Sequence, residues 1–364
     1  MSIWSRASFA ALSMSALLLA GCAVEATPEP VDQVVEAEVE QVEIEVPRHP
    51  LTGVELGTAS LSGPSLAVKI DNTSSGRPQV GIAAADLVFE ELVEGGVTRF
   101  LAVFETVIPD EVGPVRSGRP QDADLVKPFG GVFVFSGVGN SNVREIIRGT
   151  GLQLVEHDTS GGTPDGEFFF RSNIKPAPWN LHIQAADLIA SYSNLEAPVQ
   201  QFQYKSDPAE ASAMLSGEAA EEIVVVFSKG IESIWKWDVA TNTYLKFLSN
   251  GSPHNDADGT QISASNIVIL TPNYTDIEGL PSAQIAGTME TAYVATGGKI
   301  LQGLFDASAY GEPITLIDGE GNPLYLTPGK TFVLLPPGAS SNAGGVTPGL
   351  MTYLSNGETQ SRSF

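Results

Sequence analysis

Residues 86–105 decide the fold of this chain: Asp86-Leu-Val-Phe-Glu-Glu-Leu-Val93, then Glu94-Gly-Gly96, then Val97-Thr-Arg-Phe-Leu-Ala-Val-Phe-Glu105. β-Branched and aromatic residues dominate both arms, and such residues favour extended strands. The two glycines between the arms permit the backbone conformations that a tight connection needs. The segment therefore predicts a long β-hairpin.

The residues around this hairpin predict further strands and short helices. Leu66–Ile70 alternates as a strand, and Val132–Phe135 is apolar enough to be a buried one. A short helix is expected over Asn142–Arg148, with Asn142 as its N-cap, and another over Ile183–Tyr192. We therefore expect a mixed α/β domain over residues 50–200.

After about residue 200 the pattern changes to short strands separated by turn residues such as Asp318-Gly-Glu-Gly-Asn322. The expected strands are Ile223–Phe227, Ser233–Trp237, Thr243–Leu248, Asn266–Leu270, Thr291–Ala295, Ile314–Ile317, Leu324–Leu326 and Phe332–Leu335. Only residues 208–215 offer a helical pattern. The sequence thus predicts an α+β chain in which a β-rich domain over residues 201–364 follows the mixed domain.

Composition excludes several classes of function. The chain has 364 residues, 43 Asp plus Glu and 19 Lys plus Arg, which gives a formal net charge of -24. A surface this acidic is repelled by DNA and RNA phosphates, so nucleic acid is not an expected partner. With Cys22 as the single cysteine, a disulfide framework, a cysteine zinc site and a redox pair are all excluded.

The first 22 residues predict a lipoprotein signal peptide. Residues 7–20 form a largely apolar run that would span about 21 Å as a helix, which is short of the roughly 30 Å bilayer core. Leu19-Ala20-Gly21-Cys22 resembles a bacterial lipobox, which implies cleavage before Cys22 and acylation of its thiol; the alternative is an ordinary signal peptide. The acidic composition of residues 23–49 predicts a disordered tether. We expect an extracytoplasmic protein held at the membrane by lipid.

Arginines concentrate in residues 50–200, whereas residues 201–364 carry mainly lysines. Arg116 and Arg119 lie three residues apart in a loop punctuated by glycine and proline. Guanidinium groups bind carboxylates and phosphates in a bidentate manner. We therefore expect Arg99, Arg116 and Arg119 to converge with Arg77 or Arg171 on an anion site. The alternative is that these arginines pair with the acids of the same domain, namely Glu90, Glu91, Glu94 and Asp122.

Other candidate sites are weaker. Asp71 follows a strand, and ligand-facing groups often lie at such positions. The alternative, which we favour, is that Asp71-Asn72 forms a turn. Residues 253–259 hold Asp256 and Asp258 in an Asp-x-Asp-Gly pattern similar to part of a calcium loop, yet no glutamate closes it, and a hairpin turn is the preferred interpretation. The four histidines have no metal-ligand spacing. The sequence predicts neither a metal nor a cofactor.

Several blocks resemble the YerB-type bacterial lipoproteins. They include Leu66-Ala-Val-Lys-Ile-Asp-Asn72, the Glu90-Glu91 and Glu94-Gly-Gly-Val-Thr-Arg-Phe100 elements of the hairpin, Val112-Gly-Pro-Val-Arg-Ser-Gly-Arg-Pro120, and Ala177-Pro-Trp-Asn-Leu-His182 with Arg171. The resemblance covers nearly all of residues 50–340 and implies two domains of unknown function. Phe135 and Trp179 stand where we expect histidine in that family, which weakens a histidine-based mechanism.

The sequence therefore predicts a cell-envelope lipoprotein that binds a polar or anionic envelope component, or a partner protein, through its arginine-bearing first domain. The chain is not expected to be an enzyme. The alternative is a carboxylate-dependent hydrolase or transferase that acts on envelope glycans. Two carboxyl groups within about 10 Å of each other in an open cleft would favour this alternative. The candidate ligand-binding residues are Arg77, Arg99, Arg116, Arg119, Arg171, Asp71, Glu91 and Asn180.

Overall fold

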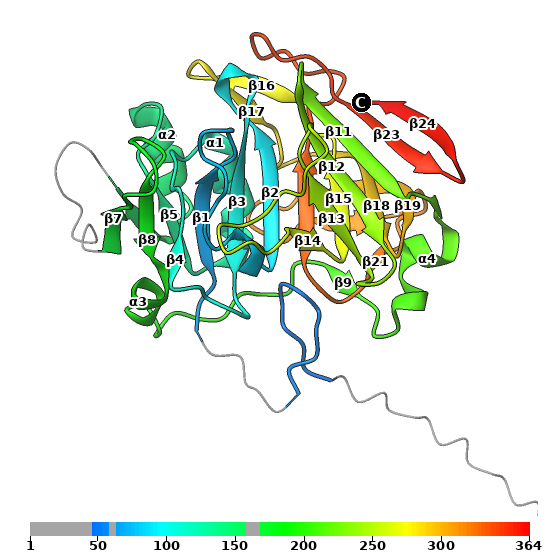
Figure 1. Cartoon of the computed structure of the whole chain (residues 1–364), viewed down its shortest axis with the longest axis horizontal. Helices are drawn as coiled ribbons and strands as arrows, with labels where there is room; N and C mark the ends of the chain where they lie inside the picture. The colour runs from blue at the N-terminus through cyan, green and yellow to red at the C-terminus, as the bar shows by residue number, and fades with distance from the viewer. Residues whose placement is uncertain (1–45, 58–62, 158–167) are drawn as a thin grey trace, which may run out of the picture. The chain divides into compact units, whose positions relative to one another are not determined.

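A computed structural model describes residues 46–57, 63–157 and 168–364 (Figure 1). The predicted signal peptide, the lipobox with Cys22 and most of the predicted tether lie outside the described residues. Two sheets dominate the described part, one of eleven strands and one of six.

The larger sheet mixes parallel and antiparallel neighbours and takes strands from both halves of the chain. Its order is β10-β19-β18-β15-β22-β2-β3-β1-β5-β6, with β20 beside β19. The bounds are β1 Leu66–Asp71, β2 Leu87–Leu92, β3 Thr98–Phe104, β5 Val132–Phe135, β6 Gln153–Glu156, β10 Glu218–Ala219, β15 Asn266–Leu270, β18 Met289–Thr296, β19 Lys299–Asp306, β20 Thr315–Ile317 and β22 Thr331–Leu335.

The predicted hairpin is confirmed as β2 and β3, which pair antiparallel from Leu87↔Val103 to Leu92↔Thr98. A 3₁₀ turn, Glu94–Gly96, connects them, and Gly95 and Gly96 adopt φ of 76° and 71°. Side chains with a Cβ adopt this left-handed region only at a cost, which explains the two glycines. All six residues of β2 are buried, because both faces of the sheet are covered here.

Strand β22 joins the two halves of the chain into one sheet. It pairs parallel with β2 on one side and parallel with β15 on the other. The apolar core is correspondingly a single cluster, with buried residues from Leu51 to Tyr353. The predicted fold class, a mixed α/β region followed by a β-rich region, is confirmed, while the boundary at residue 200 stays a prediction.

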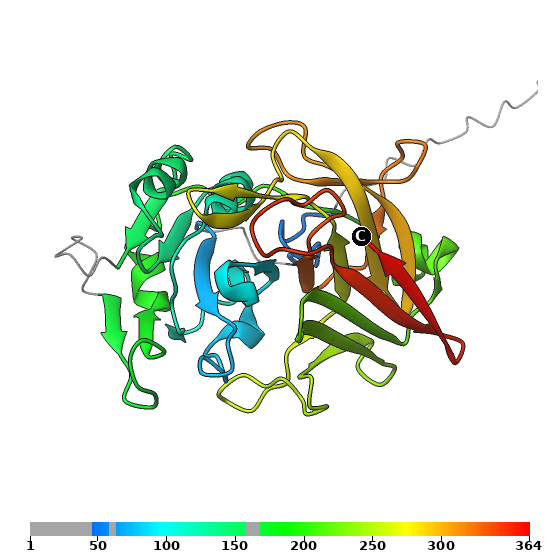
Figure 2. The same cartoon turned by 90° about the horizontal axis from the view of Figure 1, so that it is seen from above.

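The six-stranded sheet is entirely antiparallel, with the order β14-β13-β12-β11-β23-β24. In Figure 2 its strands lie on one side of β18 and β19. It packs against the larger sheet through aromatic contacts such as Trp235 with Phe332, whose ring centroids are 4.7 Å apart. The bounds are β11 Glu222–Ser228, β12 Ile231–Asp238, β13 Thr243–Phe247, β14 Ser263–Ala264, β23 Leu350–Ser355 and β24 Glu358–Ser363.

Short helices and small sheets complete the described residues. The α-helices are α1 Pro120–Val126, α2 Ser141–Arg148, α3 Ala185–Ala190 and α4 Ser212–Ser216; further 3₁₀ turns are Ile82–Ala84, Lys127–Phe129 and Pro208–Glu210. The small sheets comprise β4 Glu111–Val112, β7 Phe169–Arg171, β8 Leu181–Gln184, β9 Gln203–Tyr204, β16 Tyr274–Ile277, β17 Leu280–Ala283 and β21 Tyr325–Leu326.

Two of the helix predictions need correction. The helix expected over Ile183–Tyr192 begins only at Ala185, because the residues before it pair as β8 with β4 and β7. The N-cap of α2 is Asn140, which accepts a hydrogen bond from the Val143 backbone N–H at 3.1 Å. Asn142 instead donates to Glu278. In the part of the chain that the structure describes, no helix has the length and apolarity to cross a membrane.

Candidate functional site

A cavity of about 270 Å³ lies where the hairpin face of the larger sheet meets the six-stranded sheet. We call it the Arg77 cavity. The first half of the chain supplies residues in or next to β1, β2 and β3, and the second half supplies residues around β12 and β13. The residues that matter below are Asn72, Thr73, Ser74, Arg77, Glu90, Thr98, Glu232, Lys246 and His254.

Arg77 brings a half-buried positive charge to this cavity. Its Nε donates to Asn72 Oδ1 at 3.1 Å and its Nη2 donates to the Asn72 carbonyl at 2.7 Å. Among the described residues, no carboxylate oxygen lies within 4.0 Å of the guanidinium, and Nη1 has no hydrogen-bond acceptor. Burial lowers the pKa of Arg77, opposed by the charges of Glu90 and Asp71. The residue stays cationic because an arginine starts from a very high pKa.

Glu90 and Lys246 form a neutral pair in the wall of the cavity. Lys246 Nζ lies 2.8 Å from Glu90 Oε2, and both side chains are almost fully buried. Glu90 also accepts hydrogen bonds from Asn72, Thr98 and Ser233 at 2.7 to 3.0 Å. Burial lowers the pKa of Lys246, and the charge of Glu90 opposes this effect. With four donors around its two oxygens, Glu90 is a structural carboxylate rather than a free acid or base.

His254 lines the cavity as a neutral ring with a free acceptor. Gln79 Nε2 donates to the Asp71 carbonyl at 2.9 Å, which leaves Gln79 Oε1 as the acceptor for His254 Nε2 at 3.0 Å. The proton of the ring is therefore on Nε2, and Nδ1 carries a lone pair. Nδ1 is buried without a hydrogen-bond partner among the described residues. Burial and the charges of Lys246 and Arg77 lower the pKa of His254 to about 2.

Ser233 has the surroundings of an activated nucleophile, but a substrate in the cavity could not reach its hydroxyl. Its Oγ contacts Lys246 Nζ and accepts a hydrogen bond from Trp235 Nε1 at 3.0 Å. A serine next to a lysine with a lowered pKa is one arrangement for nucleophilic catalysis. Ser233 is however fully buried and does not line the cavity. We therefore assign its hydroxyl to the hydrogen-bond network of Glu90.

The structure brings Arg99, Arg116 and Arg119 together on the opposite face of the sheet from Glu90, and each of them has a carboxylate partner. Arg119 binds Glu94 in a bidentate manner, with Nε 2.7 Å from Oε2 and a second contact through Nη2. Arg99 Nη2 lies 3.1 Å from the same carboxylate, and Arg116 Nε contacts Asp71. These contacts are the inward ion pairs that the sequence left open as the alternative.

The remaining predicted residues lie elsewhere. Arg171 donates to Asn180 Oδ1 at 2.9 Å and does not join the other arginines in any ion pair of the described residues. Asp71 accepts from the Thr73 backbone N–H at 2.6 Å, as the predicted turn requires. Glu91 is fully buried next to Lys69, away from the cavity. Of the eight predicted ligand-binding residues, only Arg77 lines the Arg77 cavity.

Asp256 links the two halves of the chain. Its carboxylate accepts hydrogen bonds from the backbone N–H groups of Gly81 at 3.1 Å and Ala83 at 2.8 Å. Asp258 is exposed and accepts from the Thr260 backbone N–H at 2.8 Å, as in a turn. Among the described residues no group of three or more His, Cys, Asp or Glu side chains could hold a metal ion.

Sequence reasoning missed Lys69, Glu90, Lys246 and His254 as site residues. A usable signal was present, since Lys69 and Lys246 stand inside otherwise apolar strand patterns, Leu66-Ala-Val-Lys-Ile70 and Thr243-Tyr-Leu-Lys-Phe247. A lysine there needs a buried partner, because an unpaired charge is very costly away from water. The partner itself could not be named from the sequence.

Comparison with known proteins gives a consistent family match. The models for the N-terminal and C-terminal domains of a family described as "Protein of unknown function (DUF3048)" match residues 51–199 and 223–333. "Putative lipoprotein YerB" of Bacillus subtilis (strain 168) is homologous, at 32% identity over 156 residues. That match spans 43% of this chain and 44% of the relative, so less than half of the curated relative is covered.

The fold is also known from a solved structure. The crystal structure of the YerB protein from Bacillus subtilis matches with a TM-score of 0.66 and 21% sequence identity. The match covers 79% of this chain and 96% of that chain. At this identity the likeness shows a shared fold alone.

Proposed function

This chain belongs to the DUF3048 family, and we propose that it is a lipid-anchored envelope protein that binds a small anion in the Arg77 cavity. The observation that carries the proposal is the guanidinium of Arg77, which lines the cavity without a carboxylate partner among the described residues. Of the other charges of the wall, those on Glu90 and Lys246 neutralise each other, and Glu232 adds a negative charge that forms no ion pair with Arg77 among the described residues. Because no carboxylate is paired with its guanidinium, Arg77 is left to attract an anion from solution.

The polar groups of the cavity define the class of ligand. The guanidinium offers a planar array of N–H donors that fits a carboxylate or a phosphate. Thr73 and Ser74 line the same cavity; the Thr73 hydroxyl donates to Asp71 Oδ1 at 2.6 Å, so Ser74 is the hydroxyl residue left to serve a ligand. The unpaired Nδ1 of His254 is a buried acceptor in the wall of the same cavity, and a ligand hydroxyl or ammonium group would donate to it once a small shift of the wall exposes the atom. We therefore propose a small carboxylate or phosphate that also carries such a donor.

The same residues favour binding over bond cleavage. Glu90 and Glu232 are the carboxylates that line the cavity, and both oxygens of Glu90 are already hydrogen-bonded. A glycan hydrolase needs two carboxyl groups that are free to exchange protons or attack the sugar. The wall of the Arg77 cavity does not offer such a pair. For this reason we favour a binding function over a hydrolase activity.

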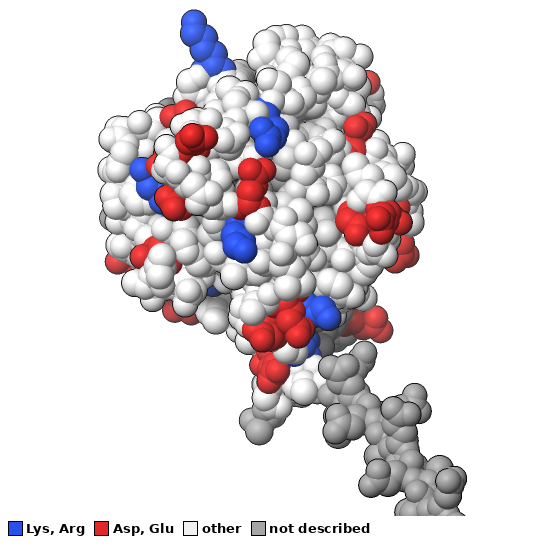
Figure 3. Space-filling view, turned by 90° about the vertical axis from the view of Figure 1, so that its right-hand side faces the viewer, with Lys and Arg blue, Asp and Glu red and all other residues white. Residues whose placement is uncertain are grey.

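The location in the envelope rests on the lipobox and on the homologue. Leu19-Ala20-Gly21-Cys22 would provide the thiol for acylation, and the homologous protein bears the name "Putative lipoprotein YerB". On the face seen in Figure 3, Lys and Arg are interspersed with Asp and Glu, and the described residues form no continuous basic patch there. Together with the net charge of -24 this supports a ligand other than nucleic acid.

Calorimetric titration of the full chain in detergent tests the proposal. The probes are inorganic phosphate, glycerol 3-phosphate and lactate, which separate phosphate from carboxylate recognition and test the added hydroxyl. We expect at least one probe to bind with a Kd of about 1 mM or tighter. Arg77→Gln should weaken that binding by about tenfold or more, because a charge-assisted bond is lost.

Arg148→Gln is the matched control. Arg148 is an exposed arginine of α2 that pairs with Glu145 and does not line the cavity. This variant should bind the probe as the wild type does. If no probe binds the wild type, or if Arg77→Gln binds as tightly as Arg148→Gln, the Arg77 cavity is not an anion site.

A further inference from the structure

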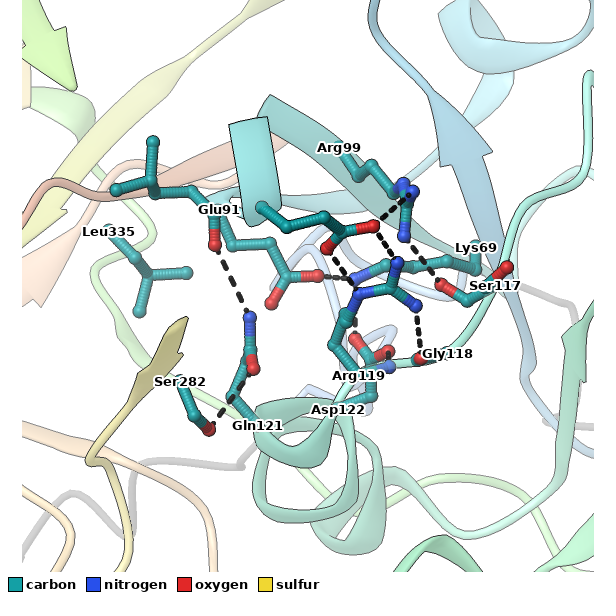
Figure 4. Close-up of polar contacts among 12 residues, drawn as sticks. Lys69, Glu91, Arg99, Ser117, Gly118, Arg119, Gln121, Asp122, Ser282 and Leu335 are labelled. Atoms are coloured by element: carbon teal, nitrogen blue, oxygen red, sulfur yellow. Dashed lines mark hydrogen bonds and ion pairs between the residues drawn. The ribbon is translucent and has the colours of Figure 1, made fainter. Parts of the chain in front are cut away.

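Lys69 and Glu91 meet on the face of the sheet opposite to Glu90. Lys69 lies in β1 and Glu91 in β2, with β3 between them. Lys69 is opposite Leu101, and Leu101 is opposite Phe89, so these side chains share one face. Glu91 is two residues from Phe89 and therefore shares that face too. Lys69 Nζ contacts Glu91 Oε1, and both side chains are fully buried (Figure 4).

A second carboxylate completes what we call the Lys69 cluster, namely Lys69, Glu91 and Asp122. Asp122 Oδ1 lies 2.7 Å from Lys69 Nζ, and the Asp122 side chain is fully buried as well. The position of Asp122 is fixed by the first turn of α1, where its Oδ2 accepts the Arg119 backbone N–H at 2.6 Å. One amine thus touches two carboxyl groups in a site without access to solvent.

Glu91 lacks the hydrogen bonds that a buried carboxylate needs. Apart from the contact with Lys69, neither of its oxygens has a hydrogen-bond partner among the described residues. Glu90, in the same strand, accepts four hydrogen bonds. A buried charge that is poorly solvated by its surroundings is strongly unfavourable, whereas a neutral amide is much less so.

We propose that Lys69 Nζ and Glu91 Cδ become joined by an intramolecular amide bond in the folded chain, with Asp122 as the proton carrier. The bond would link β1 to β2 across β3. It would replace an ammonium and a carboxylate by one neutral group whose N–H donates to Asp122 Oδ1. The charge of the cluster stays the same, because one positive and one negative charge disappear together.

The reaction balances without any further reagent. The ammonium of Lys69 first passes a proton to Glu91, which gives a free amine and a neutral carboxylic acid. The amine nitrogen then adds to Cδ, and Asp122 takes a proton from it. Asp122 returns this proton to the leaving hydroxyl, the C–O bond breaks, and one water departs. Burial lowers the pKa of Lys69 to about 8, opposed by the charge and hydrogen bond of Asp122, so the free amine is accessible near neutral pH.

Digestion of the denatured full chain with trypsin tests the proposal. Trypsin cuts after lysine and arginine but not before proline, and Arg77 is followed by Pro78. An unlinked chain gives residues 49–69 and 70–99 as separate peptides. The amide protects Lys69, so residues 49–99 should appear as one peptide whose mass is lower by one water, about 18 Da. A missed cleavage would give the same residues at the full mass.

The chain supplies its own internal control. Lys246 and Glu90 are also a buried pair, but Glu90 is fully hydrogen-bonded, so no amide is expected and trypsin should cut after Lys246. Glu91→Leu should give residues 49–69 and 70–99 separately, and so should Asp122→Asn. Circular dichroism verifies that both variants fold.

Two results would overturn the inference. Residues 49–69 and 70–99 recovered separately from the wild type, at their full masses, would mean that the Lys69 cluster is an ion pair only. If the Asp122→Asn variant gave residues 49–99 at the mass lower by one water, and in the same yield as the wild type, the amide would stand, but Asp122 would not be the proton carrier.

Discussion

Glu90 and Glu91 are neighbours in β2 and lie on opposite faces of the sheet, and each contacts a buried lysine from a different part of the chain. Glu90 pairs with Lys246 of β13, and Glu91 contacts Lys69 of β1. The alternation of side chains along a strand produces this separation. One face thereby contributes to the Arg77 cavity, and the other forms the Lys69 cluster.

Lys246→Met should destabilise the fold strongly. The substitution keeps the length of the side chain but leaves Glu90 as a buried charge without a cation, which costs about 3–5 kcal/mol of unfolding free energy. Urea denaturation measures the loss. Lys236→Met in β12 is the control, because Lys236 forms an exposed pair with Glu222 that contributes about 0–1 kcal/mol. Equal losses in both variants would contradict a special role for the Glu90 pair.

Glu94 should make stability depend on pH in the acid range. Burial raises the pKa of this carboxyl, but the hydrogen bond from Arg119 and the charges of Arg99 and Arg119 outweigh it and lower the pKa to about 2. A depressed folded-state pKa gives stability that is fully present above the ordinary value of 4.5 and is lost as the pH falls towards 2. The stability difference between wild type and Glu94→Gln should therefore shrink from pH 6 to pH 2 in urea titrations. A constant difference would exclude this linkage.

Asp256→Ala should weaken the connection between the two halves of the chain. The substitution leaves the backbone N–H groups of Gly81 and Ala83 without their acceptor, which costs about 1–3 kcal/mol. Thermal unfolding measures the effect. Asp258→Ala removes an exposed carboxylate from the same turn and should cost less. The interpretation fails if Asp258→Ala is the more damaging of the two.

Calcium should not change the melting temperature of this protein. The oxygens of Asp256 are taken by backbone N–H groups, and these donors cannot act as ligands of a cation. A ligand that binds only the native state raises its stability by RT ln(1 + [L]/Kd). A rise of several degrees on adding calcium, reversed by a chelator, would reveal a site in this turn.

Cys22→Ala should abolish membrane anchoring. Cys22 is the only cysteine of the chain and stands at the cysteine position of the predicted lipobox, Leu19-Ala20-Gly21-Cys22. Without the thiol no acyl chain can be attached, and each buried methylene contributes about 0.8 kcal/mol to anchoring. Detergent-phase partitioning measures the change. Partitioning of the variant as strong as that of the wild type would show that lipid on Cys22 is not the anchor.

The sequence alone determined several local elements of the described residues, above all the hairpin and the apolar strands. The hairpin over residues 86–105 was predictable because two β-rich arms flank Gly95 and Gly96, whose positive φ angles the turn requires. The strands Val132–Phe135 and Asn266–Leu270 were predicted with their observed bounds. These features depend on residues that are close together in the sequence and on the allowed conformations of the backbone, so a short stretch of sequence is enough to predict them.

Only the tertiary structure decided which of these elements meet. Lys246 and Glu90 are 156 residues apart, and no local pattern connects them. The insertion of β22 between β2 and β15 is equally invisible in the sequence. Strand order and the pairing of buried charges are set by packing between distant segments, and the free energy of that packing belongs to no single segment. For this reason the Arg77 cavity and the Lys69 cluster emerge only when the sheets are assembled.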